Sequence, residues 1–236
     1  MPSVAQSTRG WWGKIDYKGN PWVRNDSKDI KISKGLYNRH VSLWASHGRY
    51  YANDVDRWKW QRVNLFGTNE DLFTQTFVVP YLIPMLERAG ANVFTPRERD
   101  WQVHETVIDN DGRMMMADGR VSRYASANYV EEGVWNDYRT AGFRIPENGT
   151  LRDGDTPFNQ GTARFTRTTK KKGDSFIIYS PEIKEAGRYA VYVSYQTMEE
   201  SVDDAHYIVM HKGMDTHFRV NQRMGAGTWV YLGSFD

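Results

Sequence analysis

Three side chains that can do chemistry stand at corresponding points in the first hundred residues. His47 closes the apolar run "LWASH", Glu70 opens a helix-like segment, and Arg97 lies just past a second short apolar run. In an open α/β sheet, ligands gather at the carboxyl ends of the strands. We therefore expect an imidazole, a carboxylate and a guanidinium to meet at one edge of a sheet.

Imidazole and carboxylate are ligands of first-row metals. Zinc binds both at about 2.0–2.2 Å and, in catalytic sites, keeps one position for a water that is deprotonated near neutral pH and attacks an amide. His47 and Glu70 supply two such ligands, but two ligands do not make a site. The remaining candidates are expected beyond the adjoining loop or in a later sandwich: His104, His206, His211 and His217.

Spacing alone also permits a simpler interpretation. His47 is then a hydrogen-bonded loop residue, and Glu70 only complements the dipole of the helix that it opens. The run 97–100, "RERD", is then a solvated ion cluster.

The elements that position these residues form a strand–helix–strand unit. Residues 40–46 predict a short buried strand, and residues 91–95 predict a second one. Residues 67–90 between them predict a helix. Connections of this length make the two strands parallel, with a right-handed crossover.

The helix has clear end signals and one objection. Thr68 or Asn69 can act as its N-cap, and Gly90 suits its C-terminal end. Pro80 and Pro84 interrupt the helical pattern, because proline removes a backbone donor and clashes with the preceding turn. We expect a kinked helix, or two helices that meet near Pro80.

The rest of the chain follows other patterns. Residues 1–36 are polar, basic and punctuated by Gly and Pro, which predicts an extended lead-in with little regular structure. Residues 111–236 contain short alternating segments such as "YAVYVSY", and "VMHKGMDTHFRV" predicts a hairpin around Lys212-Gly213. Several short strands with this spacing are typical of an antiparallel β-sandwich.

Composition narrows the function classes. The net charge of +2 gives no indication of a nucleic-acid partner. With no cysteine, the chain has no disulfide and no thiolate site. No apolar run approaches the ~20 residues of a membrane span, and the start lacks the apolar middle of a signal peptide. Aromatic residues make up 14% of the chain, which is typical of sugar-binding surfaces but also of well-filled cores.

The stretch from "LWASHGRYY" to "TPRERD" resembles the opening of the zinc-dependent N-acetylmuramoyl-L-alanine amidase family. In that family a strand ends in a His-Gly pair, a zinc-binding Glu opens a helix, and a G-x-x-V strand leads to an R-x-x-D signature. The matching residues here are His47-Gly48, Glu70, 90–93 and 97–100. The resemblance implies His47 and Glu70 as zinc ligands.

The same resemblance implies further roles. Arg97 positions substrate or braces the loop through Asp100, and Gly48 and Asp100 are structural. The family's Gly-rich segment is replaced here by "RYYANDVDRWKWQR", whose Tyr50, Trp58 and Trp60 we expect, with Tyr51, to form a cleft wall. The family's third ligand, a later His, and its catalytic Glu have no counterpart, so no catalytic residue is assigned within this chain.

The second half resembles the carbohydrate-binding-type sandwich found in golvesin and in some xanthan lyases. The segments that carry this resemblance are "YAVYV", "DAHYIVMHKG" and "VNQRMGAGTWVYLGSF". We therefore expect α/β plus all-β architecture: a partial three-layer α/β amidase-like domain (parallel βαβ) followed or interrupted by an antiparallel β-sandwich. The expected boundaries are a lead-in at 1–36, the α/β segment at 37–110 and the sandwich at 111–236.

The leading functional hypothesis is a zinc-dependent cell-wall hydrolase that acts on peptidoglycan or another polysaccharide. Two alternatives are a non-catalytic polysaccharide-binding module and a polysaccharide lyase that uses Tyr50 and Arg97. The resemblances imply a fragment of a large bacterial protein that is secreted, periplasmic or on the cell surface. Such a fragment is expected to be inactive by itself.

Overall fold

The chain folds into two compact units. The computed structural model describes residues 18–97, 99, 102–116, 119–123, 127–138, 141–147, 154–170 and 173–236. Unit 1 holds the chain up to Trp22 together with Lys28–Arg99, and unit 2 holds Val23–Ser27 together with Asp100–Asp236. A short piece of the predicted lead-in therefore belongs to the second unit.

Unit 1 contains the predicted parallel strand pair. Strand β2 (His40–Ser42) pairs with β7 (Asn92–Phe94) in parallel, with Val41 opposite Val93. The first strand is shorter than the predicted 40–46 and is not buried, because its two end residues face solvent. Trp22 covers the pair by stacking on Phe94, with ring centroids 4.0 Å apart.

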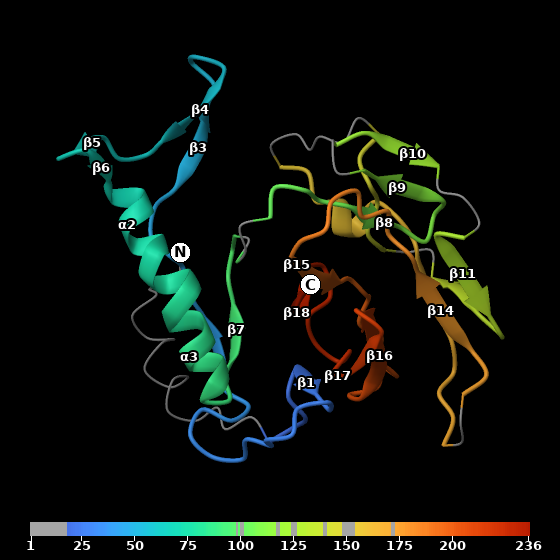
Figure 1. The fold of residues 1–236 in the computed structure, drawn as a ribbon. Helices are drawn as coiled ribbons and strands as arrows, with labels where there is room; N and C mark the ends of the chain where they lie inside the picture. The colour runs from blue at the N-terminus through green and yellow to red at the C-terminus, as the bar shows by residue number, and fades with distance from the viewer. Residues whose placement is uncertain are drawn as a thin grey trace, which may run out of the picture. The chain divides into compact units, whose positions relative to one another are not determined.

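The crossover between these strands is helical but not one regular helix. It runs through α2 (Glu70–Phe77), a π-helical turn η1 (Val78–Leu82) and α3 (Ile83–Arg88), alongside β7 (Figure 1). In the π-turn, the Ile83 N–H donates to the Val78 carbonyl, five residues back. The wider turn contains Pro80, so the interruption predicted there is confirmed.

The π-turn changes which residues face the sheet. A π-turn takes up one more residue than an α-turn, so the buried stripe shifts by one position on its N-terminal side. Ile83 is 1% exposed and Asp71 is 0% exposed, whereas Leu72, which an unbroken helix would align with Ile83, is 40% exposed.

Two hairpins occupy the loop between His47 and the helix. Strands β3 (Arg49–Ala52) and β4 (Arg57–Trp60) form the first, and β5 (Asn64–Leu65) and β6 (Thr68–Asn69) form the second. The aromatic, basic stretch therefore forms β-hairpins between the first strand and the helix of the strand–helix–strand unit.

Unit 2 consists of antiparallel strands, as expected for a sandwich. Its sheets pair β1 with β17 and β16, β15 with β18, β11 with β14, β12 with β13, and β8 with β9 and β10. Their bounds are β1 Val23–Asn25, β8 Val107–Ile108, β9 Arg113–Met115, β10 Val121–Arg123, β11 Tyr129–Glu132, β12 Asn136–Tyr138, β13 Ala163–Phe165, β14 Phe176–Tyr179, β15 Tyr189–Val193, β16 Ala205–His211, β17 Met214–Val220 and β18 Val230–Phe235, with a 3₁₀ turn η2 at Pro157–Asn159.

The strands around β17 hold the core of unit 2. Phe218 and Val220 of β17 are 1% and 0% exposed, and Val230 and Leu232 of β18 are also buried. Strand β1 lies on the open edge of β17, so residues 1–36, which were predicted to have little regular structure, contain a short strand at Val23–Asn25. Residues 1–17 of the predicted lead-in lie outside the described residues.

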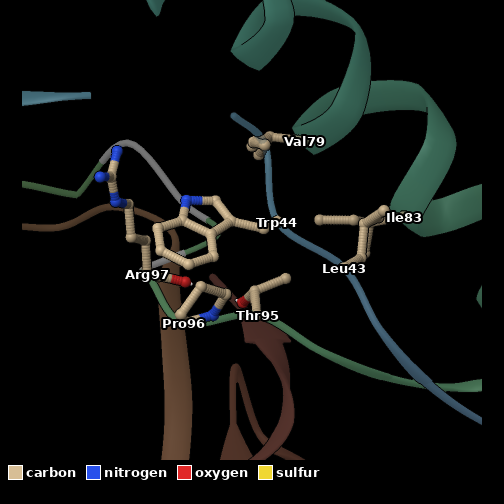
Figure 2. Close-up of a pocket in the computed structure, with 8 residues that line it drawn as sticks. Leu43, Trp44, Val79, Ile83, Thr95, Pro96 and Arg97 are labelled. Carbon is tan, nitrogen blue, oxygen red and sulfur yellow. Dashed lines mark hydrogen bonds between the residues drawn. The ribbon is translucent and has the colours of Figure 1, made fainter. Parts of the chain in front are cut away.

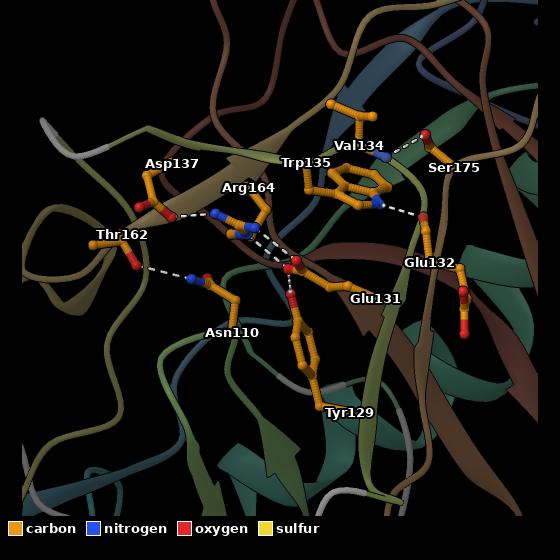
Figure 3. Close-up of polar contacts among 10 residues, drawn as sticks. All are labelled: Asn110, Tyr129, Glu131, Glu132, Val134, Trp135, Asp137, Thr162, Arg164 and Ser175. Atoms are coloured by element: carbon orange, nitrogen blue, oxygen red, sulfur yellow. Dashed lines mark hydrogen bonds and ion pairs between the residues drawn. The ribbon is translucent and has the colours of Figure 1, made fainter.

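A partly exposed ion network ties two of the smaller sheets together. Arg164 of β13 donates to both carboxylate oxygens of Glu131 on β11, at 2.6 Å each, and also contacts Asp137 of β12 (Figure 3). The Tyr129 hydroxyl donates to the same Glu131 carboxylate. Because the Arg164 guanidinium hydrogen-bonds Glu131, the pKa of this carboxyl lies below its ordinary value.

In the part of the chain that the structure describes, no helix has both the length and the apolar character needed to cross a bilayer.

Candidate functional site

His47 lies in unit 1 beyond the carboxyl end of β2. Ser46 precedes it with φ at +67°, a left-handed conformation that is uncommon for serine, and the Ser46 hydroxyl lies 3.3 Å from His47 Nδ1. The ring faces Asp71 in the first turn of α2, with Nδ1 3.8 Å from Asp71 Oδ1. The expected meeting of a histidine and a helix-start carboxylate therefore occurs, but with Asp71.

The Asp71 carboxylate is held firmly at one end only. Its Oδ2 accepts a hydrogen bond from the Arg62 backbone N–H at 2.9 Å, and its own backbone N–H donates to Asn69 Oδ1, the N-cap, at 2.9 Å. Its Oδ1 is buried and has no hydrogen-bond partner among the described residues. Burying a carboxylate oxygen without a hydrogen-bond donor costs free energy. A cation or a donor bound at this oxygen would offset that cost.

Glu70, the predicted ligand, is the first residue of α2 and is exposed to solvent. Two signals in the sequence pointed to its neighbour instead. Asn69 as N-cap fixes the start of the helix. The π-turn that contains Pro80 adds one residue to the helical segment, and this extra residue rotates Asp71 onto the buried stripe.

The side chain of Arg62 covers the outer side of His47. Its Nε lies 3.3 Å from His47 Nδ1 and its Nη2 lies 3.0 Å from His47 Nε2. A guanidinium group donates hydrogen bonds but cannot accept them. Arg62 therefore donates to the ring nitrogen of His47 that carries the lone pair. A metal ion at His47 would have to displace Arg62.

The structure brings Gly48 and Arg97 together. A Cβ atom on Gly48 would overlap the Arg97 guanidinium, so only glycine leaves this side chain its place. The Arg97 Cζ atom also lies 6.0 Å from the ring centre of Trp44, as a weak cation–π contact.

A small pocket lies between this corner and the helix. Figure 2 shows its walls, with Trp44 beside Arg97 and with Val79 and Ile83 of the helical segment opposite. Its volume of about 20 Å³ holds one water molecule, so it is not a sugar site.

Arg99 of the "RERD" run has a structural role in unit 1. Arg99 pairs with Glu87 of α3 at 2.7 Å and is nearly buried, so it anchors the end of β7 to the helix. Asp100, the predicted structural aspartate, lies outside the described residues.

The aromatic hairpin is not a single wall. Cross-strand partners share a face, so Tyr51 and Trp58 lie together with Arg49 and Trp60, whereas Tyr50 lies with Lys59 on the opposite face. The Tyr51 and Trp58 rings meet edge to face at 5.7 Å, and Arg49 lies over Trp60 at 5.4 Å. The grouping of Tyr50 with Trp58 and Trp60 is therefore wrong, because strand residues alternate between faces.

The pair His47 and Asp71 fits two positions of a zinc site. Two ligands of tetrahedral zinc lie about 3.3 Å apart, so a shift of about half an ångström would close the 3.8 Å gap. Within the described ranges, no third His, Cys, Asp or Glu completes a metal-binding group.

The four other candidate histidines, His104, His206, His211 and His217, contact polar side chains of unit 2. His104 Nε2 lies 3.2 Å from Glu185, and His211 Nε2 lies 2.9 Å from the Thr216 hydroxyl. His206 and His217 hydrogen-bond each other. Burial, together with the charges of Arg219 and His217, lowers the pKa of His206.

Comparison with known proteins addresses the C-terminal part. Residues 143–236 match the family model of the Golvesin C-terminal domain, which confirms the predicted resemblance there. No curated protein and no solved structure matches the chain. The amidase resemblance of the N-terminal part receives no support from these comparisons.

Proposed function

We propose that unit 1 supplies two metal ligands, His47 and Asp71, to a zinc-dependent amide hydrolase of the N-acetylmuramoyl-L-alanine amidase type. The supporting observation is the buried Asp71 Oδ1, which lacks a hydrogen-bond partner among the described residues and lies 3.8 Å from His47 Nδ1. The substrate would be peptidoglycan, and the protein would then act outside the cytoplasm: secreted, periplasmic or on the cell surface.

The chain's own residues would prepare this corner before the metal arrives. The Asn69 cap and the Arg62 backbone N–H orient the Asp71 carboxylate, while Ser46 limits the rotation of the His47 ring. Bound zinc would polarise the scissile carbonyl and lower the pKa of a water. No third ligand and no general base are assigned to residues of this chain, so we expect the chain by itself to be inactive toward peptidoglycan.

Metal content after dialysis against zinc tests this proposal. The expected result is that His47→Ala and Asp71→Asn each lower zinc affinity by about tenfold or more. Glu70→Gln is the matched control, because it removes the neighbouring charge on the exposed side of the same helical turn, and it should leave binding unchanged.

Two outcomes would contradict the assignment. If Glu70→Gln lowers affinity and Asp71→Asn does not, the original choice of Glu70 is the better one. Equal zinc content in all variants would exclude a metal site at this corner.

A second function, polysaccharide binding by unit 2, is favoured by the match of residues 143–236 to the Golvesin C-terminal domain. Within that range, Trp229 is 37% exposed while Phe143 and Phe158 pack against it at 4.7 and 5.6 Å between ring centres. A held but accessible indole is suited to stacking on a pyranose face.

Calorimetric titration with peptidoglycan fragments and acidic polysaccharides would test this second function. Trp229→Ala should weaken binding at least about tenfold, and Phe176→Ala, another exposed aromatic of the matched region, should not. Thermal melting of both variants checks that the fold survives. Absence of binding across both glycan classes would count against the proposal, and an unsaturated, ultraviolet-absorbing product would indicate a lyase instead.

A further inference from the structure

Two histidines lie side by side on the outer face of the sheet formed by β1, β17 and β16. His206 pairs in register with Arg219, and His217 pairs with Ile208, so the histidines are diagonal neighbours on the same face. His206 Nε2 lies 2.9 Å from His217 Nδ1, and the rings are nearly parallel, with centres 5.1 Å apart at 20°. Neither ring is buried, so solvent reaches the pair.

We propose that His206 and His217 together bind a divalent first-row transition-metal ion, with Cu²⁺ or Ni²⁺ fitting best. Imidazole nitrogens at about 2.0–2.1 Å from an ion lie about 2.9 Å apart when the angle between them is 90°, and about 3.3 Å apart at a tetrahedral angle. The observed 2.9 Å is the right-angle value. Right angles between nitrogen ligands are typical of tetragonal Cu²⁺ and Ni²⁺ sites.

Both rings can present the required nitrogen lone pairs as neutral imidazoles. One of the two nitrogens carries the hydrogen of their mutual hydrogen bond. When a metal binds, that ring moves its hydrogen to its other nitrogen, which is a change of tautomer and leaves both rings neutral. The ion lies to one side of the line between the two nitrogens, and each ring turns by about 45° so that its lone pair points at the ion.

The backbone beneath His217 is held in place. Its N–H donates to the Ser27 hydroxyl at 2.9 Å, and its carbonyl accepts from the Asp26 N–H at 2.9 Å. One ligand is therefore positioned before binding, which lowers the entropy lost when the ion is bound.

The neighbouring charges are largely balanced. Asp26 accepts from Arg24 at 2.7 Å and from Arg219 at 3.2 Å, using both carboxylate oxygens. The carboxylate thus offsets part of the positive charge that would repel a cation, but it is not placed as a third ligand. Water would fill the remaining coordination positions.

Copper titration of the whole chain, followed by electron paramagnetic resonance, tests the proposal. We expect the pair to bind one Cu²⁺ with two equatorial imidazoles, seen as coupling to two histidine nitrogens. His206→Gln and His217→Gln should each lower the affinity by about tenfold or more and leave one imidazole in the spectrum. Both side chains lie on the surface, so a thermal melt serves only to confirm that each variant is folded.

Two control variants make the result specific. His211→Gln lies on the same strand as His206 but points to Thr216, and it should leave the copper spectrum unchanged. His47→Gln removes the histidine ligand proposed for unit 1, so copper that this variant still binds is bound at another site. The proposal is overturned if the double variant His206→Gln/His217→Gln binds copper with the affinity and spectrum of the wild type.

Discussion

Asp109 is a carboxyl group held in an unusual ionisation state. It is 4% exposed and accepts the Ile145 backbone N–H at 3.2 Å. Burial, and then the charge of Asp111 two residues later, raise the pKa of Asp109 to about 7. The folded protein therefore holds a proton that the unfolded chain releases at about pH 4.

This raised pKa predicts that stability falls as the pH rises. Between about pH 4 and pH 7 the folded state binds more protons than the unfolded state, so the free energy of unfolding declines through this range and then levels off. Asp109→Asn keeps an acceptor for Ile145 and removes the charge, so it should raise stability at pH 8 by about 1–3 kcal/mol. Urea midpoints at several pH values measure the difference from wild type.

Asp111→Asn is the companion variant, because it removes the like charge but leaves Asp109 ionisable. It should end the decline at a lower pH, because loss of the Asp111 charge lowers the pKa of Asp109, and it should give a smaller gain at pH 8 than Asp109→Asn. Parallel curves for wild type and Asp109→Asn would show that Asp109 titrates normally.

At the residue scale, the carboxylate that faces His47 lies one position from the predicted one. Strand order alone brought His47, a first-turn carboxylate and Arg97 to one corner, and the structure places His47 against Asp71 and Arg97 against Gly48. Whether Glu70 or Asp71 faces His47 depends on the rotation of the helix about its axis. That rotation is set by a π-turn, which hydrophobic periodicity does not reveal.

At the element scale, hairpins and strand pairing were predictable where local signals were strong. Lys212 and Gly213 have φ values of +45° and +73°, and they join β16 to β17 in the register that a two-residue turn dictates. The turn demands left-handed backbone at both positions. Glycine meets this demand at no steric cost, and lysine does not.

The hairpin turn gives an element-scale prediction. No atom lies within 4 Å of a Cβ added to Gly213, so Gly213→Ala should cost only the backbone strain, about 1 kcal/mol. Lys212→Asn should gain about 0.5 kcal/mol, because asparagine tolerates the left-handed region better. Denaturation followed by circular dichroism measures both changes, and a stabilising Gly213→Ala would contradict the turn geometry.

At the scale of the whole molecule, the two units are not consecutive along the chain. Strand β1 belongs to unit 2, and residues 28–99 of unit 1 intervene before the chain returns to it. A three-residue strand in a polar stretch carries no periodicity, and its partner β17 lies nearly two hundred residues away. Only tertiary pairing defines this strand, so sequence patterns did not predict it.

This arrangement predicts that β1 protects the edge of unit 2. The Asp26 N–H donates to His217, so the alternation of an antiparallel ladder makes Arg24 the next hydrogen-bonded position, opposite Arg219. Arg24→Pro removes that donor, whereas Arg24→Ala keeps the backbone N–H and removes the ion pair with Asp26. We expect amide hydrogen exchange in β17 to accelerate about tenfold or more in the proline variant and to stay near wild type in the alanine variant. Strands β15 and β18, which pair with each other, should exchange as in wild type in both variants. Unchanged protection of β17 in Arg24→Pro would mean that β1 contributes nothing to the stability of this sheet.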